Sequence, residues 1–269
     1  MPVPLLQIDA FTRERFGGNP AAVCLLDGPR PAEWMQAVAA EMNLSETAFL
    51  VPTASNRFDL RWFTPTVEVA LCGHATLASA HAVWATGRAT REAPVTFDTR
   101  SGPLVASPAD EGAITIDLPA REVDEMPLPD DLVRALGVSP RWTGAARKGP
   151  GDRDYLVEVS SEAEVRDAQP DFAALRSHAG GIILTAAGQT AGWDVVSRYF
   201  APAYGIDEDP VTGSAHCALA TFWTARLGRR SFVARQVSRR GGTLHVTLDG
   251  SRVRLTGHAV TVLTGELEG

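Results

Sequence analysis

The chain contains 269 residues, of which 45% are hydrophobic and 21% charged, which is typical of a globular protein with one large domain or two of common size. The formal net charge of -7 argues against a nucleic-acid backbone or an anionic membrane surface as the main partner, because both attract a positive surface. Three scattered cysteines exclude a disulfide framework, and without a signal-peptide pattern or a membrane-length apolar run we expect a cytoplasmic protein.

Short β-branched segments bounded by Gly, Pro or Asp predict strands along the whole chain. In the first half they span residues 3–11, 21–26, 58–63, 95–99 and 114–118. In the second half they span residues 155–159, 181–185, 195–200, 243–248 and 252–257. Helices are predicted at residues 31–42, 129–136 and 171–177, and in the alanine-rich segments after Cys72 and Thr212. This mixture predicts the α+β class.

An internal repeat relates the two halves of the chain. Phe63-Thr64-Pro65 is followed by Gly73-His74-Ala75 and an alanine-rich segment, and Phe200-Ala201-Pro202 is followed in the same way by Gly213-Ser214-Ala215. The offset stays at about 140 residues, and an ordered series of matches at a steady spacing indicates a structural duplication.

The repeat predicts two similar lobes, residues 1–120 and 121–269, with a last strand that can return to the first lobe. Each lobe is expected to be a curled, mostly antiparallel sheet around a central helix, and the two to be related by pseudo-twofold symmetry. A linker is predicted in residues 117–131, where prolines and acidic residues cluster without apolar periodicity.

The two alanine-rich helices begin with glycine, at Gly73 and Gly213. A helix N-terminus leaves backbone N–H groups unpaired and carries partial positive charge, so it can bind a carboxylate or phosphate, and glycine lets the ligand come close. The alternative is that glycine only allows close helix–sheet packing. Neither start has the spacing of a phosphate-binding loop, so no nucleotide cofactor is indicated.

Four motifs resemble those of the PhzF family, the phenazine biosynthesis-like proteins. They are GGNPAAV at 17–23, NLSETAF at 43–49, GHAT at 73–76 and DPVTGSAH at 209–216. The resemblance implies a diaminopimelate epimerase-like fold, an active site in a cleft between the lobes, a homodimer and no cofactor. It also implies proton transfer: PhzF itself isomerises a dihydro-hydroxyanthranilate ring, with a glutamate of the NLSET motif as acid and base.

Carried over residue by residue, the resemblance implies the catalytic residues Glu46, His74 and Asp209, and the substrate-binding residues Asn19, Gly73, Gly213 and Ser214. A carboxyl that abstracts a carbon-bound proton needs a raised pKa and a water-poor cleft, and Glu46 stands between apolar Leu44 and Phe49. The alternative role for Glu46 or Ser45 is to cap a helix end. Asp209 and Ser214 have a similar alternative as a turn or helix cap.

Other polar groups are weaker candidates. The remaining histidines have no ligand-like spacing with acidic residues, so no metal site is predicted. Arg61 and Glu68 flank the first loop and are expected to form a structural pair. Residues 207–209 make an acidic cluster that either raises the pKa of a carboxyl by repulsion or is simply a solvated loop.

Two other functions stay open. The same fold supports epimerases that use one cysteine from each lobe, and Cys72 stands where the first of these would be. The second loop has Pro210 and Val211 at the matching place, and Cys217 lies on the helix, so the thiol pair is broken. The other alternative is a non-catalytic small-molecule-binding protein. We expect an isomerase acting on a small carboxylate whose identity the sequence does not give.

Overall fold

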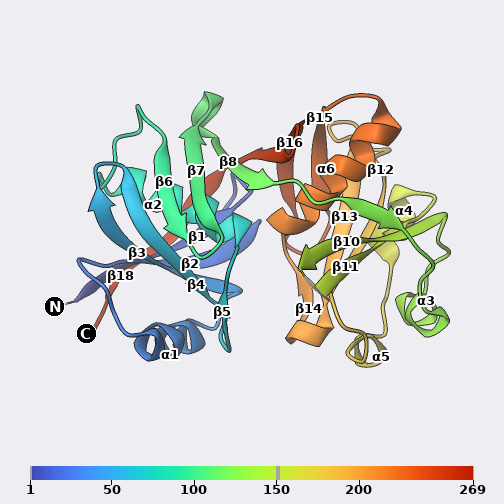
Figure 1. The fold of residues 1–269 in the computed structure, drawn as a ribbon, viewed down its shortest axis with the longest axis horizontal. Helices are drawn as coiled ribbons and strands as arrows, with labels where there is room; N and C mark the ends of the chain where they lie inside the picture. The colour runs from blue at the N-terminus through green and yellow to red at the C-terminus, as the bar shows by residue number, and fades with distance from the viewer. Residues whose placement is uncertain (1, 150–151, 269) are drawn as a thin grey trace. The chain divides into compact units, whose positions relative to one another are not determined.

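The computed structural model describes residues 2–149 and 152–268, and it divides into two compact units (Figure 1). Unit 1 contains the residues up to Leu118 together with those from Leu255 onward, and unit 2 contains Pro119–Arg254. The chain thus passes from unit 1 to unit 2 inside the segment predicted as a linker. Its last part belongs to unit 1, so unit 2 is shorter than the predicted lobe of residues 121–269.

Unit 1 consists of strands and two α-helices. In chain order they are β1 (Val3–Ala10), β2 (Asn19–Leu25), α1 (Ala32–Met42), β3 (Glu46–Ala54), β4 (Arg57–Phe63), β5 (Glu68–Val69), α2 (Gly73–Ala85), β6 (Val95–Thr99), β7 (Gly102–Pro108), the 3-10 turn η1 (Asp110–Gly112), β8 (Ile114–Pro119) and the closing strand β18 (Ala259–Leu267).

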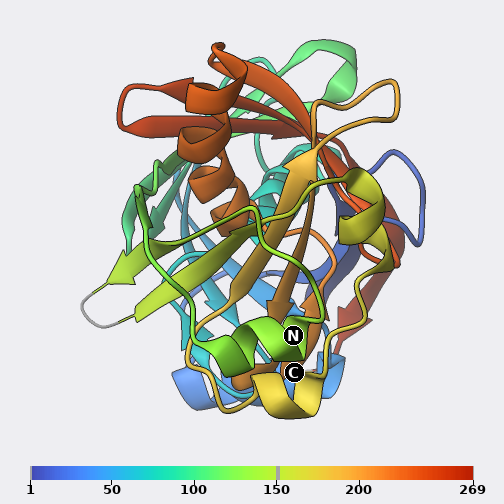
Figure 2. The same cartoon turned by 90° about the vertical axis from the view of Figure 1, so that its right-hand side faces the viewer.

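Unit 2 has a similar content with two more short helices. In chain order its elements are β9 (Val123–Glu125), α3 (Asp130–Leu136), β10 (Trp142–Gly149), β11 (Asp152–Glu158), α4 (Glu162–Asp167), α5 (Phe172–Leu175), β12 (Ile182–Ala187), β13 (Val195–Ala201), the 3-10 turn η2 (Pro202–Tyr204), β14 (Ile206–Asp209), α6 (Gly213–Leu227), β15 (Ser231–Gln236) and β16 (Gly242–Asp249), followed by β17 (Arg252–Gly257) at the unit boundary. Helices α3 and α5 contact each other at one end of this unit (Figure 2).

The two units repeat one succession of strand pairings. In unit 1 the order β1-β2-β3-β4-β6-β7 is antiparallel, parallel, antiparallel, parallel and antiparallel, and β5 adds to β4. In unit 2 the order β10-β11-β12-β13-β15-β16 has the same senses, and β14 adds to β13. The sheets are therefore mixed rather than purely antiparallel. The pseudo-twofold relation between the lobes stays a prediction.

A matched ion pair accompanies this repeat. Arg61 on β4 donates to both carboxylate oxygens of Glu68 on β5 at 2.7 and 2.9 Å, which confirms the predicted pair. Arg198 on β13 does the same to Glu208 on β14 at 2.7 and 2.9 Å. Each arginine also lies over the phenylalanine two residues further along its strand. The short strands that lead into α2 and α6 are thus fastened alike.

Each sheet packs around the glycine-led helix of its unit. All residues of α2 except His81 and Ala85 are buried, and the helix contacts β1, β2 and β3. Alanine-rich sequence suits this position, because small side chains let strands approach a helix from all sides. None of the helices in the described ranges has both the length and the apolar character that crossing a bilayer requires.

Several elements were not predicted, and one of them matters for the site. Strand β3 begins at Glu46, whereas the sequence left open a helix end there. Helix α1 ends earlier, at Met42, with Asn43 in the left-handed conformation as its C-cap. The idea that Ser45 or Glu46 caps a helix is therefore wrong. β3 pairs with the following strand β4 in a hairpin and runs parallel to β2. Its sequence is a run of buried residues followed by Pro52 and exposed residues, so it lacks the apolar–polar alternation that indicates a strand.

A buried carboxylate holds α4 to the turn after β12. Glu162 is 2% exposed and accepts hydrogen bonds from the N–H groups of Gln189 and Thr190, from the Thr190 hydroxyl and from Arg166. Burial alone would raise the pKa of Glu162, but these donors outweigh it and lower the pKa from 4.5 to about 2.

We expect Glu162→Gln to lower the free energy of unfolding by about 2 kcal/mol at neutral pH. Because the folded pKa lies below the unfolded one, this stabilisation is present above pH 4.5 and is lost as the pH falls toward 2. Urea unfolding at several pH values checks this, with Glu164→Gln on the same helix as the control. A difference between variant and wild type that stays constant down to pH 2.5 would contradict it.

Candidate functional site

The start of α2 presents unpaired backbone N–H groups inside unit 1. Cys72 is the N-cap residue and its side chain caps nothing, and the helical ladder begins with the hydrogen bond from Thr76 N–H to Cys72 C=O. Gly73 and His74 occupy the first two helical positions. Their N–H groups point out of the helix and favour a negative charge nearby.

Glu46 places its carboxylate beside this helix start. Strand β3 runs parallel to β2, with Glu46 in register with Ala21, and its side chain is 16% exposed. Its Oε2 lies 3.2 Å from Nε2 of His74, whose side chain is 5% exposed. The distance is that of an ion pair or hydrogen bond, although the alignment of the two groups falls short of hydrogen-bond geometry.

The imidazole of His74 is neutral, because burial lowers its pKa to about 3. Its tautomer follows from its neighbours. The Asn19 side-chain nitrogen, which can only donate, lies 3.2 Å from Nδ1 of His74, so Nδ1 accepts and the proton sits on Nε2. Ser45 donates to the Asn19 side-chain oxygen at 3.2 Å, which fixes the orientation of that amide. His74 therefore directs an N–H toward Glu46.

Cys72 completes this group. Its sulfur lies 3.6 Å from Nδ1 of His74, and the residue as a whole is 6% exposed. Ligand-type atoms of Glu46, Cys72 and His74 all lie within 4.8 Å of one another, so these three residues are the group in the described ranges that could hold a metal ion. The set of sulfur, nitrogen and oxygen suits a zinc-like ion, although the sulfur approaches the nitrogen opposite to the one facing Glu46.

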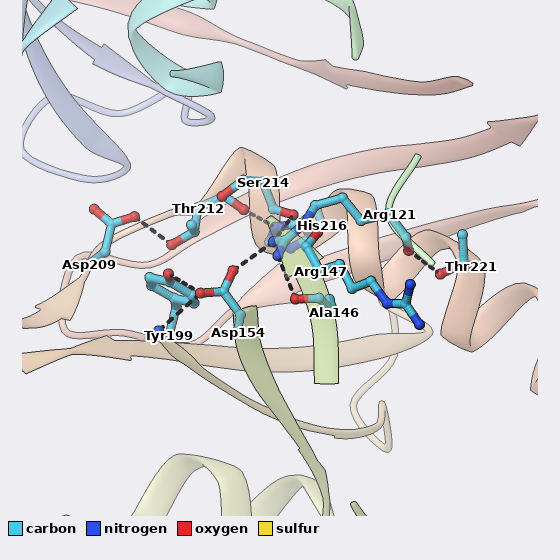
Figure 3. Close-up of polar contacts among 11 residues, drawn as sticks. Arg121, Ala146, Arg147, Asp154, Tyr199, Asp209, Thr212, Ser214, His216 and Thr221 are labelled. Carbon is cyan, nitrogen blue, oxygen red and sulfur yellow. Dashed lines mark hydrogen bonds and ion pairs between the residues drawn. The ribbon is translucent and has the colours of Figure 1, made fainter. Parts of the chain in front are cut away.

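Asp209 lies at the end of β14, directly before the loop that leads to α6 (Figure 3). Its side chain is buried and accepts a hydrogen bond from the Thr212 hydroxyl. Gln236, which is fully buried, donates to the Asp209 carbonyl at 2.7 Å and accepts from Thr212 N–H at 2.9 Å. The Asp209 carboxylate and its backbone are thus held from two sides.

The start of α6 resembles the start of α2. Thr212 is the N-cap and, like Cys72, does not cap the helix with its side chain. The ring of His216 donates from Nδ1 to the Thr212 carbonyl at 2.8 Å, and burial lowers its pKa to about 4. Ser214 is half-buried at the second helical position, and its hydroxyl makes no hydrogen bond with any residue the structure describes. Ser214 is therefore not a helix cap and is available to a ligand.

Each carboxylate of the acidic cluster at 207–209 has a partner of its own. Glu208 pairs with Arg198, Asp207 with Arg176 at 3.2 Å, and Asp209 with the Thr212 hydroxyl. Residues 207–209 lie on β14, so the interpretation as a solvated loop is wrong, and the raised pKa of a carboxyl stays a prediction.

The predicted residues fall into two groups. Unit 1 brings together Asn19, Glu46, Gly73 and His74, and unit 2 brings together Asp209, Gly213 and Ser214. Sequence reasoning missed the residues that support them. Ser45 and Thr212 could have been found from the sequence, because both lie within the NLSETAF and DPVTGSAH motifs. Gln236 stands in no motif, and only the pairing of β13 with β15 brings it to this loop.

Strand-rich units, each with an uncapped, glycine-led helix inside a mixed sheet, define a mixed α/β protein built mostly of strands. Residues 8–265 match the family described as phenazine biosynthesis-like protein, PhzC-PhzF. An uncharacterized isomerase of Halalkalibacterium halodurans is 47% identical over 269 residues, with 99% of each chain covered. The chain belongs to the PhzC-PhzF family.

Solved structures agree with this placement. A phenazine biosynthesis protein of the PhzF family from Enterococcus faecalis has a TM-score of 0.90 at 39% identity, and all of both chains is covered. A hydroxyproline epimerase from Agrobacterium vitis has a TM-score of 0.66 at 15% identity, with 99% of this chain and 91% of that chain covered. The second likeness shows the fold alone, which the family shares with epimerases.

The orientation of His74 can be tested by NMR of its ring nitrogens. Between pH 8 and pH 5 we expect one neutral form with the proton on Nε2, because the pKa is about 3 and Asn19 donates to Nδ1. In Asn19→Asp the neighbour becomes an acceptor, so the proton should move to Nδ1. Ser45→Ala leaves the Asn19 donor in place and serves as the control. Protonation of both nitrogens above pH 5 in the wild type would contradict the assignment.

Proposed function

We propose that this protein is a cofactor-independent isomerase that moves a proton between two carbons of a small carboxylate-bearing substrate, with Glu46 as acid and base. The observation that carries the proposal is the Glu46 carboxylate beside the oriented, neutral imidazole of His74 at an uncapped helix start. The naming of a relative at 47% identity as an isomerase supports the same class of reaction.

The reaction follows from these groups. The Glu46 carboxylate takes a proton from carbon, so a C–H bond breaks, an O–H bond forms on Glu46 and the electron pair is delocalised into the substrate as an enolate-like anion. The Nε2–H of His74 and the N–H groups of the helix start stabilise negative charge without becoming charged themselves. Glu46 then returns the proton to another carbon, which regenerates its carboxylate.

Other residues bind and orient. We assign the backbone N–H groups of Gly73 and Gly213 and the Ser214 hydroxyl to the substrate carboxylate, and Asp209 to a polar substituent such as an ammonium or hydroxyl group. A single substrate served by both helix starts, in a cleft between the lobes, is the part of this proposal that the family resemblance supports. Asn19 is assigned to the orientation of His74, since its amide contacts the imidazole. The homodimer stays a prediction.

Two alternative functions each differ from the proposed isomerase in one observable property. A cysteine-dependent epimerase would use Cys72, the N-cap of α2, together with a second cysteine. The N-cap of α6 is Thr212, directly after the Pro210 and Val211 expected at the matching place, so no second cysteine stands there. A non-catalytic binding protein would bind a carboxylate without exchanging any carbon-bound proton. Neither accounts for the oriented imidazole beside Glu46 as directly as proton transfer does.

Exchange of carbon-bound hydrogen in deuterated water separates these functions. With 2,3-dihydro-3-hydroxyanthranilate and a panel of amino and hydroxy acids as probes, we expect Glu46→Gln to slow deuterium incorporation by about 10³-fold, because it removes the base. Cys72→Ala should stay within about threefold of wild type. Circular dichroism and thermal unfolding control for folding.

Two other results of these measurements would support the alternative functions. A loss in Cys72→Ala as large as in Glu46→Gln would favour the cysteine-dependent epimerase. Binding of a panel member by calorimetry, without exchange in the wild-type protein, would favour the non-catalytic protein.

A further inference from the structure

The position in unit 2 that matches Glu46 is a glycine. In unit 1 Thr47 on β3 lies opposite Phe63, and in unit 2 Ile182 on β12 lies opposite Phe200. The repeat matches these phenylalanines, so the residues one step earlier match as well. They are Glu46 in unit 1 and Gly181 in unit 2.

The carboxylate of unit 2 instead comes from the neighbouring strand. On β2 the register partner of Glu46 is Ala21. On β11 Tyr155 is the partner of Ile182, so Asp154 lies beside Gly181. Gly181 N–H donates to Oδ1 of Asp154 at 3.0 Å. Both units therefore carry a carboxylate at this level of the parallel strand pair, but on different strands: Glu46 on β3 in unit 1 and Asp154 on β11 in unit 2.

Asp154 is engaged by strong donors, unlike a catalytic base. It is fully buried, Arg121 donates to Oδ2 at 2.6 Å, and the Tyr199 hydroxyl donates to Oδ1 at 2.9 Å (Figure 3). Burial, then the nearby charges of Asp154 and Asp209, raise the pKa of Tyr199 well above its ordinary value, so it stays a donor. A carboxylate held this way is a poor acceptor of a proton from carbon.

The cluster leaves no room for a side chain at residue 181. A Cβ on Gly181 would lie 2.0 Å from the Tyr199 hydroxyl oxygen and 2.6 Å from Oδ1 of Asp154. Glycine is therefore required there, and the space that corresponds to the Glu46 side chain is filled by the phenol and the carboxylate.

Arg121 connects Asp154 to the first turn of α6. Its guanidinium donates to the carbonyls of Ser214 at 3.3 Å and of Ala146 at 2.9 Å (Figure 3). Its backbone carbonyl accepts from the Thr221 hydroxyl at 2.7 Å, so the arginine is fastened to the helix at both ends. On the other side, Tyr199 lies opposite Asp209 in the pairing of β13 with β14.

We propose that Arg121, Asp154 and Tyr199 form a positioning cluster that fixes the Asp209 and Ser214 side of the substrate site. This inference rests on the proposed function, in which those two residues bind substrate. It assigns to unit 2 a rigid, non-basic counterpart of the Glu46 group, so that acid and base chemistry stays with Glu46. None of the three residues is proposed to touch the substrate.

Hydrogen exchange tests the cluster without any substrate. In Tyr199→Phe we expect the amides of Thr212 and of the first hydrogen-bonded turn from His216 to exchange about tenfold faster, because the loop and helix start open locally more often. Asp154→Asn should have a larger effect. The matched control is Glu158→Gln, which removes the carboxylate that β11 offers to Arg226 at the far end of α6.

Arg121→Lys sharpens the test. Lysine keeps the charge opposite Asp154 but lacks the planar guanidinium that also reaches the carbonyls of Ser214 and Ala146. The amides at the start of α6 should therefore exchange faster in Arg121→Lys than in the wild type. Unchanged exchange in both Tyr199→Phe and Asp154→Asn, or equal acceleration in Glu158→Gln, would overturn the proposal. Tyr199→Phe removes one hydroxyl, which makes it the variant expected to fold even if Asp154→Asn does not.

A kinetic measurement connects the cluster to turnover. With the exchange substrate of the proposed function, Tyr199→Phe should raise KM about tenfold with a smaller change in kcat, because binding geometry is disturbed while Glu46 is intact. A large loss in kcat at unchanged KM would instead make Tyr199 part of the chemistry and overturn the positioning role. If the wild type shows no exchange with any probe, the proposed function fails while the amide measurement still decides the cluster.

Discussion

A carboxylate taken out of water beside a buried helix start has to be stabilised by nearby donors, and the choice of donors decides what it can do. Desolvation of an unpaired charge costs several kcal/mol. Strong donors such as a guanidinium and a phenol offset that cost and make the carboxylate inert. A neutral imidazole is a weaker donor than a guanidinium and offsets less of that cost. Both arrangements occur in this molecule, at Asp154 and at Glu46.

The shared topology explains why the two sites can differ without disturbing the fold. Each unit builds the same sequence of pairings, fastens its short strand with an arginine–glutamate pair and begins its central helix with glycine. These features fix the backbone. Position 46 in unit 1 matches position 181 in unit 2, and position 21 matches position 154. Register partners on a parallel pair project to the same face, so the carboxylate can stand on either of the two strands without a change in the backbone.

Sequence reasoning predicted much of this fold and named residues that each unit brings together, because the motifs are continuous in sequence. GHAT gives Gly73 and His74, and NLSET gives Ser45 and Glu46. It did not predict β3, because the run of buried residues at the start of this strand lacks apolar–polar alternation. It also missed Arg121, Asp154 and Tyr199, which stand in three separate segments, two of them outside any motif match and one inside the predicted linker. The pairing of β11, β12 and β13 brings Asp154 and Tyr199 together, and the long side chain of Arg121 reaches Asp154 from the segment between β8 and β9.

The asymmetry bears on which reaction suits the site. An epimerase that inverts one carbon needs two bases on opposite faces, one to remove a proton and one to supply another. In unit 2 the matching carboxylate is occupied by Arg121 and Tyr199, and the matching N-cap is a threonine whose hydroxyl donates to Asp209. A single base that removes a proton can return it only to the face from which it came. Under the proposed function, that restriction fits the transfer of a proton along a conjugated substrate better than inversion at one carbon.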